Sequence, residues 1–373
     1  MMEDQELLYR MALTLALRHH PKAQRILVDT LGSAAAVFAC RRELGTRFEH
    51  LSERMATAVA AMEELLPRCE QEMEYAARHR IRVLTCDDED YPTRLALCED
   101  APLVLYALGQ GTWNAPHVVS IVGTRRCTER GREMCQRLTQ GLAEAVPGTL
   151  VVSGLAYGID IAAHRGALQG GLPTAGVLAH GLDEIYPRTH RSTAIGMLEQ
   201  GGLLTEFMSG TPIDRLNFLQ RNRIVAGMAD AVVVVESPAR GGSLNTARMA
   251  AEYHRDVFAV PGRPTDATAE GCNMLIRSNG AVLITGVDDL LTDMGWKGKD
   301  TEVQQQRLLF AELTAEEQEV VDALAAADGD LSQDELAAAL DRPAYKITPL
   351  MLALEMKGVV KMLPGGRAHL QRK

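Results

Sequence analysis

The sequence predicts an α/β protein whose core is an open parallel sheet with helices on both faces. Two observations carry this prediction. Between residues 118 and 285, short apolar runs alternate with segments of helical periodicity, which is the pattern of parallel strands connected by helices. The flanking regions, residues 5–75 and 313–373, show mainly helical spacing. A small helical domain is therefore expected before the sheet and another compact domain after it.

The composition indicates a globular protein of two or three domains. The chain has 373 residues, of which 46% are hydrophobic, and this is ample for a buried core. The seven cysteines form no C-x-x-C pair, so neither a zinc site nor a disulfide framework is indicated. The acidic N-terminus has no signal-peptide pattern, and no apolar run approaches a membrane span. We expect a cytoplasmic protein without membrane association, metal or cofactor.

The distribution of charge is more informative than its sum. A net charge of −10 argues against a generic nucleic-acid binder. Residues 118–295, however, carry sixteen basic and eighteen acidic residues, and every cation among them is an arginine; no lysine occurs between Lys22 and Lys297. Arginine binds phosphate with a bidentate fork and stacks on bases. The compositional bias of a GC-rich genome explains this usage equally well, and the arginines offer the same chemistry in either case.

The first 109 residues change character near residue 76. Helical spacing relates Leu7, Leu8, Met11 and Leu15, and Gly32-Ser33 marks a turn before a further helix. We therefore assign residues 1–75 to the small helical domain and residues 76–296 to the sheet domain. Two apolar runs, Ile81–Leu84 and Leu103–Tyr106, resemble strands that flank Tyr91-Pro92.

The sheet itself is expected from seven apolar runs separated mostly by helical segments. These runs are Val118–Val122, Leu150–Ser153, Thr174–Leu178, Leu203–Glu206, Ala231–Glu236, Val257–Val260 and Ala281–Thr285. Ligands of such sheets bind at the carboxyl ends of the strands. The loops that follow the runs are therefore the places to search for a site.

The C-terminal region predicts a winged helix-turn-helix. Residues 297–312 are polar and resemble a linker. Residues 313–373 begin with a capping box from Thr314 to Glu317. Further helices and a hairpin with its turn at Pro364-Gly365-Gly366 complete the expected domain. Its lysines are offset by acids, so both a duplex-DNA reader and a protein-binding module remain open.

Two loops combine glycine with groups that suit phosphate. Gly123-Thr124-Arg125-Arg126 follows the first run; glycine lets the backbone approach a phosphate and an arginine reaches over it, although a simple turn with solvated arginines is the alternative. Ser153-Gly154-Leu155-Ala156-Tyr157-Gly158 follows the second run, and its glycines stand four apart, unlike the dinucleotide fingerprint. Asp160 is expected to cap the next helix, and His164 is expected to be structural.

Three further loops differ in what they offer. The loop from Gly181 to Pro187 holds acids and an aromatic, but no cation before Arg188. The segment from Arg215 to Arg223 places Phe218 beside arginines, which suits base stacking with phosphate contact; burial of Phe218 in the core is the alternative. The Gly241-Gly242-Ser243 turn follows a valine-rich run and offers donors at a helix start.

No set of residues predicts catalysis. The chain has no G-x-S-x-G elbow, no Walker A lysine and no H-x-x-x-H pair. Its scattered acids, Asp160, Glu206, Glu236 and Glu252, are better suited to capping or orienting loops. Many donors without a clear general base indicate binding rather than turnover, so we do not predict an enzyme.

Taken together, these loops resemble the DNA-processing protein A family, DprA or Smf. The resemblance runs from about Tyr91-Pro92 to Leu290 and rests on an ordered series of motifs. They are Val122–Arg126, Ser153–Asp160, Ala163-His164, Gly181–Asp183, Tyr186-Pro187, Arg221–Gly227, Gly241–Ala247 and Ala259–Gly262. Departures occur at Leu219, where the family commonly has proline, and at Thr189-His190, where it has Glu-Asn.

The resemblance implies a fold and a function. The fold is an extended Rossmann-like core with a SAM or helix-hairpin-helix-like N-terminal domain and a winged-helix tail, although Arg18-His19-His20-Pro21 stands where many relatives have a glycine-rich hairpin. The function is binding of single-stranded DNA in natural transformation, with loading of the RecA recombinase, usually by a homodimer and without established turnover.

The resemblance also implies the site. Phosphates would be held by the first loop (Gly123, Thr124, Arg125, Arg126), the second loop (Ser153, Gly154, Ala156, Tyr157, Gly158) and the glycine turn (Gly241, Gly242, Ser243, Asn245, Thr246). Arg215 and the Arg221, Asn222, Arg223 cluster would add charge and polar contacts, and Phe218 would stack on a base.

One alternative function is an enzyme. The Gly241–Thr246 turn followed by Glu252 is loosely similar to the Gly-Gly-x-Gly-Thr-x-x-Glu loop of nucleoside-monophosphate phosphoribohydrolases. In those enzymes the glutamate would assist glycosidic cleavage. Here the glutamate is displaced and the second loop differs.

Overall fold

The computed structural model describes residues 2–48, 51–296, 313–327, 331–357, 359–363 and 367–370. The chain divides into two compact units, residues 1–296 and residues 297–373. The linker expected at residues 297–312 and the turn expected at residues 364–366 lie outside the described residues.

The first unit begins with helices α1 (Met2–Ala16), α2 (Pro21–Leu31), α3 (Ala34–Ala39), α4 (Leu44–Arg47), α5 (Glu53–Ala60), η1 (Met62–Leu65) and α6 (Leu66–Arg78). The turn expected at Gly32-Ser33 is present. Gly32 ends α2 with a left-handed φ of 88°, a conformation that favours glycine, and the Ser33 side chain caps α3 by accepting from the Ala36 N–H.

One sheet organises the rest of this unit. Its strands are β1 (Arg82–Thr85), β2 (Val104–Leu108), β3 (Val118–Val122), β4 (Leu150–Ser153), β5 (Thr174–Val177), β6 (Gly202–Thr205), β7 (Ala231–Val234), β8 (Asp256–Ala259) and β9 (Val282–Leu283). Their order is β1-β2-β6-β5-β4-β3-β7-β8-β9. Strands β3 to β9 pair in parallel, which confirms the predicted α/β core. Strands β1 and β2 add an antiparallel edge, which periodicity alone does not specify.

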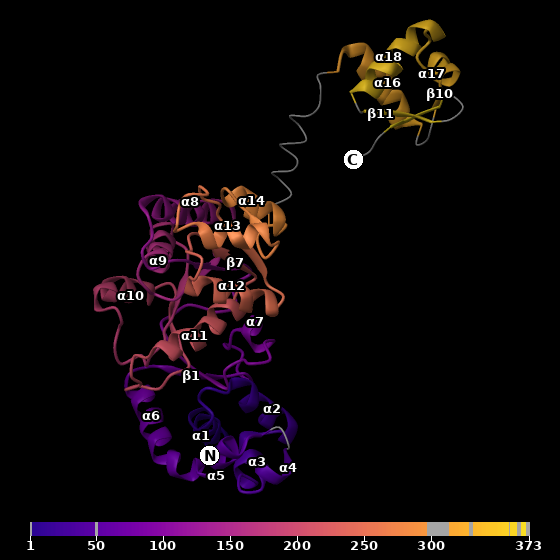
Figure 1. Ribbon diagram of the computed structural model, residues 1–373. Helices are drawn as coiled ribbons and strands as arrows, with labels where there is room; N and C mark the ends of the chain where they lie inside the picture. The colour runs from indigo at the N-terminus through magenta and orange to yellow at the C-terminus, as the bar shows by residue number, and fades with distance from the viewer. Residues whose placement is uncertain are drawn as a thin grey trace. The chain divides into compact units, whose positions relative to one another are not determined.

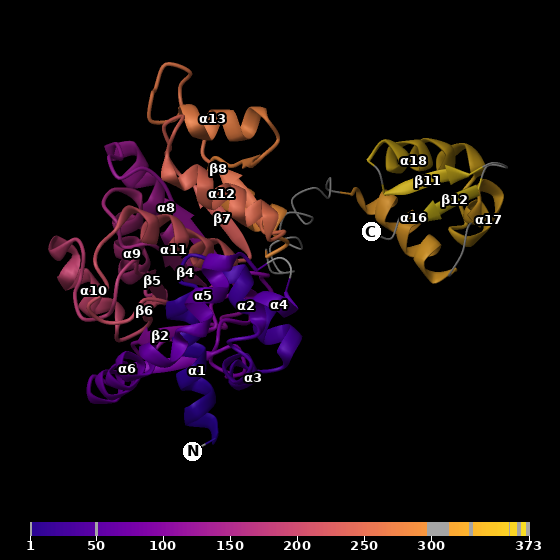
Figure 2. The same ribbon diagram turned by 60° about the horizontal axis from the view of Figure 1, so that its bottom comes forward.

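Helices cover both faces of the parallel strands (Figures 1 and 2). They are α7 (Thr93–Ala96), α8 (Glu129–Ala145), α9 (Ile159–Gln169), η2 (Arg188–His190), α10 (Arg191–Met197), α11 (Arg215–Gly227), α12 (Gly242–Glu252), α13 (Glu270–Arg277) and α14 (Val287–Asp293). Alternate residues of β3 face opposite layers, as strand geometry requires. Val118 and Val122 join the core shared with α11 and α12, whereas Val119 and Ile121 join the core shared with α8 and α9.

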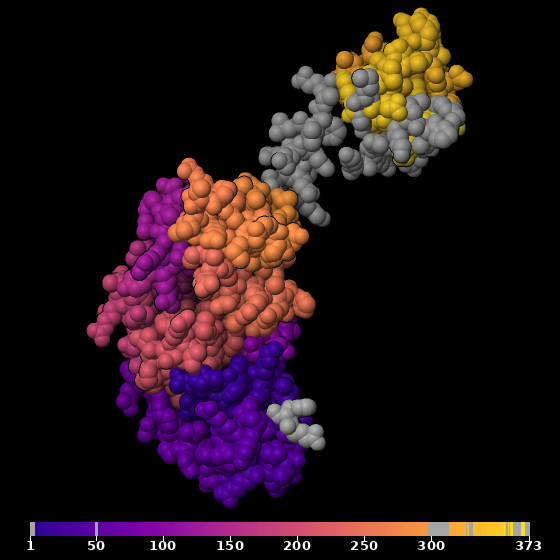
Figure 3. Space-filling view, viewed as in Figure 1, coloured from indigo at the N-terminus to yellow at the C-terminus, as the bar shows by residue number. Residues whose placement is uncertain are grey.

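The N-terminal helices pack on the antiparallel edge of the sheet. Met11, Leu13 and Leu17 are fully or almost fully buried in one core with Val104 and Tyr106 of β2. Figure 3 shows their indigo and purple surface directly against that of the sheet region. Among the described residues, no helix is long and apolar enough to cross a membrane.

The second unit has the helices and the small antiparallel sheet that are typical of a winged helix. It contains α16 (Ala315–Ala326), β10 (Leu331–Ser332), α17 (Gln333–Ala339), α18 (Ala344–Met356), β11 (Val360–Leu363) and β12 (Arg367–Leu370), with sheet order β10-β12-β11. The predicted capping box is confirmed, because the Thr314 side chain and the Glu317 side chain bond to each other's backbone N–H. Antiparallel pairing of β11 with β12 likewise confirms the predicted hairpin strands.

Candidate functional site

The connectivity of the sheet opens a crevice beside β3. From β3 the chain continues through β4, β5 and β6 on one side, and it returns to β7 on the other side. The loops that follow β3 and β7 therefore diverge at the carboxyl edge, and this is where open α/β sheets bind ligands. A cleft of about 510 Å³ lies at this place.

Most of the predicted site residues line this cleft. They are Gly123, Thr124, Arg125, Arg126, Gly154, Ala156, Arg215, Phe218, Arg221, Asn222, Gly241, Gly242, Ser243, Asn245 and Thr246. They come from the loops after β3, β4 and β7, from α11 and from the first turns of α12. Residues more than one hundred positions apart in the sequence are thus brought to one surface.

Backbone contacts fix the loops after β3, β4 and β7 to one another. The Thr124 N–H donates to the Glu236 carbonyl at 2.7 Å, and the Ile159 N–H donates to the Thr124 carbonyl at 3.2 Å. Gly158 has a φ of 79°, and a Cβ at this position would lie 2.1 Å from the Thr124 oxygen. Glycine is required there because any side chain would separate the first two loops.

The start of α12 offers unused backbone donors to the cleft. Gly241 is its N-cap and has no side chain to cap the helix. A Cβ built on Gly242 meets no atom within 4 Å, so the first turn is open. The Ser243 hydroxyl donates to the Ser237 hydroxyl at 2.9 Å. An eleven-residue helix with an uncapped N-terminus favours an anion through its N–H groups and its dipole.

Arginines supply the charge of the cleft. Arg125, Arg126 and Arg215 are exposed, whereas Arg221 lies at the floor with 3% of its surface exposed. Arg221 donates to the Gly154 carbonyl at 2.7 Å and also to the Val177 carbonyl.

The charge of Arg221 is preserved at neutral pH. Burial lowers the pKa of its guanidinium to about 10, which is still far above 7. The acid that lines the cleft, Asp160, is buried in the first turn of α9, and this burial raises its pKa while Arg221 opposes the rise. Asp160 also accepts from the Ala156 N–H at 3.4 Å, so it orients the second loop.

Phe218 stands among cations rather than in the hydrophobic core. Its side chain is half-buried, and the guanidinium carbons of Arg125 and Arg221 lie 4.9 and 5.8 Å from its ring centroid. The Tyr186 ring approaches it edge-on at 6.2 Å. A half-buried aromatic ring beside guanidinium groups is suited to stacking on another planar group.

Four predicted residues are not brought to the cleft. The Ser153 hydroxyl is fully buried and donates to the Ile121 carbonyl at 2.6 Å. Tyr157 and Gly158 line a neighbouring groove. Arg223 does not line the cleft and bonds instead to Asp100 and Glu206.

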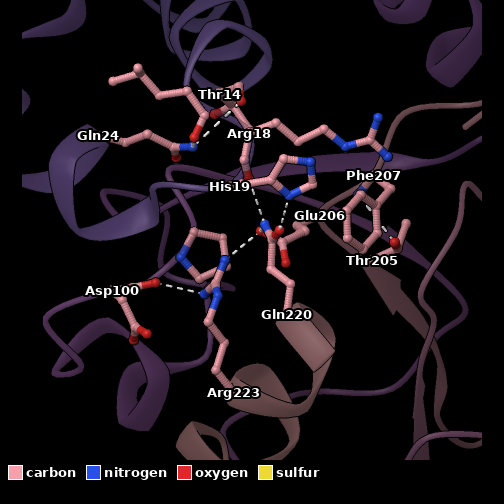
Figure 4. Close-up of polar contacts among 12 residues, drawn as sticks. Thr14, Arg18, His19, Gln24, Asp100, Thr205, Glu206, Phe207, Gln220 and Arg223 are labelled. Carbon is pink, nitrogen blue, oxygen red and sulfur yellow. Dashed lines mark hydrogen bonds and ion pairs between the residues drawn. The ribbon is translucent and has the colours of Figure 1, made fainter. Parts of the chain in front are cut away.

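Arg223 belongs to a buried polar junction (Figure 4). It donates to the Asp100 carbonyl at 2.6 Å and forms an ion pair with Glu206, and both partners of that pair are at most 5% exposed. Gln220 donates to the Glu206 carboxylate at 3.2 Å and to the Arg18 carbonyl, in the turn after α1, at 2.8 Å. Arg223 is therefore committed to the fold and cannot bind a phosphate in the cleft.

The other titratable groups singled out in the sequence have structural surroundings. His164 is fully buried; its Nε2 accepts from the Leu155 N–H and its Nδ1 bonds to the Thr174 hydroxyl at 2.7 Å. Burial lowers the pKa of His164 to about 3, so it is neutral, as expected for a structural histidine. Glu236 accepts from the Thr128 backbone and hydroxyl. Glu252 is exposed at the end of α12 and does not line the cleft.

The sequence interpretation missed one cation of the cleft. Arg240 is exposed and lines the cleft just before the Gly241 turn. Its position offered a signal, because a cation directly before a glycine turn lies at the same strand end as the turn. Pro238 and Leu219 also line the cleft.

Comparison with protein families gives two matches. Residues 82–295 match the model of the DNA recombination-mediator protein A family, and residues 307–366 match the DprA winged helix domain. The first match contains every residue of the cleft.

Individual relatives agree with these matches. The chain is 36% identical to a putative DNA processing protein DprA of Mycobacterium tuberculosis, over 91% of this chain and 88% of the relative. It is 35% identical to protein Smf of Escherichia coli, over 78% of each. The crystal structure of DNA processing protein A from Streptococcus pneumoniae superposes with a TM-score of 0.57 at 34% identity, covering 64% of this chain and 84% of that one. A Helicobacter pylori structure, described as giving insights into the single-stranded DNA binding mode of DNA processing protein A, superposes with a TM-score of 0.52 at 28% identity, covering 58% and 97%.

Proposed function

This chain belongs to the DNA-processing protein A (DprA/Smf) family, and on that premise we propose that it binds single-stranded DNA in the cleft. One observation carries the proposal. Five arginines and a half-buried phenylalanine line one cleft together with a single acid, in a protein whose net charge is −10. The attraction for a polyanion is therefore local to this site.

Different groups of the cleft bind the phosphates and the bases of the strand. The N–H groups at the start of α12 and the exposed Arg125, Arg215 and Arg240 bind phosphates, while Arg221 holds the floor in place and adds charge. Phe218 stacks on a base, which contributes about 1–3 kcal/mol and is tolerant of sequence. None of these groups reads base edges in a duplex groove, so single strands are preferred.

A binding assay at two salt concentrations tests this function. Fluorescence anisotropy would compare a single strand, a duplex and a mononucleotide. We expect the single strand to bind best, with log K falling by about 0.7 for each phosphate contact per unit of log salt. Salt-independent affinity, or equal affinity for duplex, would contradict the proposal.

Arginine variants locate the site in the same assay. We expect Arg125→Ala and Arg240→Ala each to weaken single-strand binding about tenfold and to reduce the salt slope by about 0.7, because each removes one charged phosphate contact. The matched control is Arg277→Ala, which removes an exposed arginine that lies in the last turn of α13 and does not line the cleft. Normal binding by both cleft variants would place the site elsewhere.

The proposal extends to assembly and to cellular role. We infer a homodimer, because Met274, Val282 and Leu283 are 42–51% exposed around β9, the last strand of the sheet, and exposed apolar edges favour pairing. Light scattering of Leu283→Lys tests this inference; an unchanged mass would contradict it.

From the family resemblance we also propose a role in natural transformation, with transfer of the bound strand to RecA. RecA filament assembly that is equally fast with the wild type and with Arg125→Ala would contradict transfer from this cleft.

A further inference from the structure

A second groove of about 490 Å³ adjoins the cleft over the N-terminal half of α8 and along the length of α9. We call it the side groove. It is lined by Arg125, Arg126, Arg132, Tyr157, Arg165 and His190, among others. Its volume is close to that of the cleft, and the family resemblance gives no role to Arg132 or Arg165.

Cations outnumber acids in the side groove. Four arginines line it together with one acid, Glu129, whose carboxylate pairs with Arg132. Arg165 donates to the Thr193 hydroxyl at 3.4 Å, which leaves its charge unneutralised by that contact. The groove therefore has a net positive charge on a protein that is negative as a whole, and it attracts an anion for the same reason as the cleft.

An exposed aromatic ring belongs to the same groove. The Tyr157 residue is 47% exposed, yet it is held in place. Its ring lies edge-on to the His190 ring at 4.9 Å, and the buried His190 bonds through Nδ1 to the Leu155 carbonyl at 2.8 Å. A fixed aromatic face beside arginines is the combination that binds single-stranded nucleic acid without sequence preference.

The cleft and the side groove share a ridge. Arg125 and Arg126 line both the cleft and the side groove. The ridge is rigid, because the Thr124 carbonyl accepts from the Ile159 N–H and lies against Gly158. A chain of phosphates that leaves the cleft over Arg125 thus reaches the side groove without crossing a negatively charged surface.

We propose that the side groove is a second subsite for the single strand that the cleft holds. Arg132 and Arg165 bind phosphates of the nucleotides that adjoin those in the cleft, and Tyr157 stacks on one of their bases. This inference rests on the proposed function and deepens it, since it gives the direction in which the strand leaves the cleft.

Strand length separates the two subsites in an experiment on the full-length protein. An oligothymidylate of about four nucleotides occupies the cleft, and one of about twenty extends beyond it. We expect the double variant Arg132→Ala/Arg165→Ala to bind the short strand like the wild type, and to bind the long strand about tenfold more weakly with a salt slope reduced by about 1.4. Tyr157→Ala should also weaken long-strand binding, whereas Tyr157→Phe should retain it because the ring remains.

The outcomes distinguish this inference from the function on which it rests. Unchanged long-strand binding by the double variant and by Tyr157→Ala would overturn the side groove while leaving the cleft intact. Equal loss for short and long strands would also overturn it, because the residues would then act on the cleft itself. If the wild type bound neither strand, the proposed function would fail and the inference with it. Thermal unfolding of each variant, compared with Arg277→Ala, excludes loss of the fold as the cause.

Discussion

The two sides of α11 carry arginines of equal burial and different roles. Arg221 and Arg223 are both 3% exposed and stand two residues apart. Arg221 faces the cleft and donates to two carbonyl oxygens, whereas Arg223 faces the N-terminal helices and pairs with the Glu206 carboxylate. In the first arrangement neutral carbonyl groups hold the guanidinium, and Asp160 acts on it only as a nearby charge. The second cancels the charge inside the protein.

This difference teaches how one helix serves both architecture and binding. For a buried arginine, a carbonyl partner fixes the geometry of the cation and leaves a net positive charge for a ligand, whereas a buried carboxylate partner cancels that charge. Burial alone therefore does not reveal which arginine is available to a phosphate. The partner of each arginine does, and variants on the two sides of α11 should fail in different ways.

The largest effect is expected on the stability of the buried polar junction between Arg223 and Glu206. Arg223→Ala leaves Glu206 buried without its cation and should lower the free energy of unfolding of the first unit by about 3–5 kcal/mol. The double variant Glu206→Leu/Arg223→Met should recover most of that loss, because no charge then remains buried. Denaturant unfolding measures both; a single variant as stable as the wild type would remove the contrast between the two sides.

A substitution on the cleft side of α11 should weaken single-strand binding and leave the free energy of unfolding unchanged. Phe218→Ala removes a half-buried ring that belongs to none of the hydrophobic cores, and it should weaken single-strand binding by about 1–3 kcal/mol. Phe218→Tyr, which keeps the ring, is the matched control. If Phe218→Ala bound DNA normally but unfolded more easily, the ring would be structural after all.

A pH titration probes a support of the second loop. The pKa of His164 is depressed to about 3 in the folded protein, against an ordinary value of 6.5. Its contribution to stability is therefore complete above pH 6.5 and is lost as the pH falls toward 3. Between about pH 7.5 and 5.5, the wild type should lose about 1.4 kcal/mol more than His164→Gln. Parallel curves for the two proteins would show that His164 does not resist protonation.

The smallest effect is expected at Glu252. Since it lies outside the cleft and pairs loosely with Arg248 at 3.8 Å, Glu252→Ala should leave single-strand binding unchanged. Incubation of the wild type with nucleoside monophosphates should release no free base. Base release that depended on Glu252 would favour the phosphoribohydrolase alternative instead.

Sequence periodicity predicted most of the sheet but not its edge. The strands at Val118–Val122 and Leu150–Ser153 are found with the predicted bounds, because unbroken apolar runs between helices are a strong local signal. The antiparallel pairing of β1 and β2 with the parallel strands depends on contacts far apart in the chain, and no local pattern records it.

The cleft, like the sheet, could be predicted only in part from the sequence. Its glycine loops could be predicted because each follows a buried strand. The grouping of Arg221 with Arg223 was wrong because Arg223 pairs with Glu206 and does not line the cleft. Positions two apart on a helix are rotated by about 200° about its axis, so the two side chains leave α11 in different directions. Arg240 was missed, although a residue directly before the Gly241 turn lies at the same strand end as the turn.

The guanidinium groups of the cleft have a consequence for cellular control. Lysine side chains are the targets of acetylation and ubiquitination, and arginine is exempt from both. Since no lysine occurs between Lys22 and Lys297, lysine acylation cannot change the charge of the residues that line the cleft. The lysines that such modification can reach are Lys22 and those from Lys297 onward.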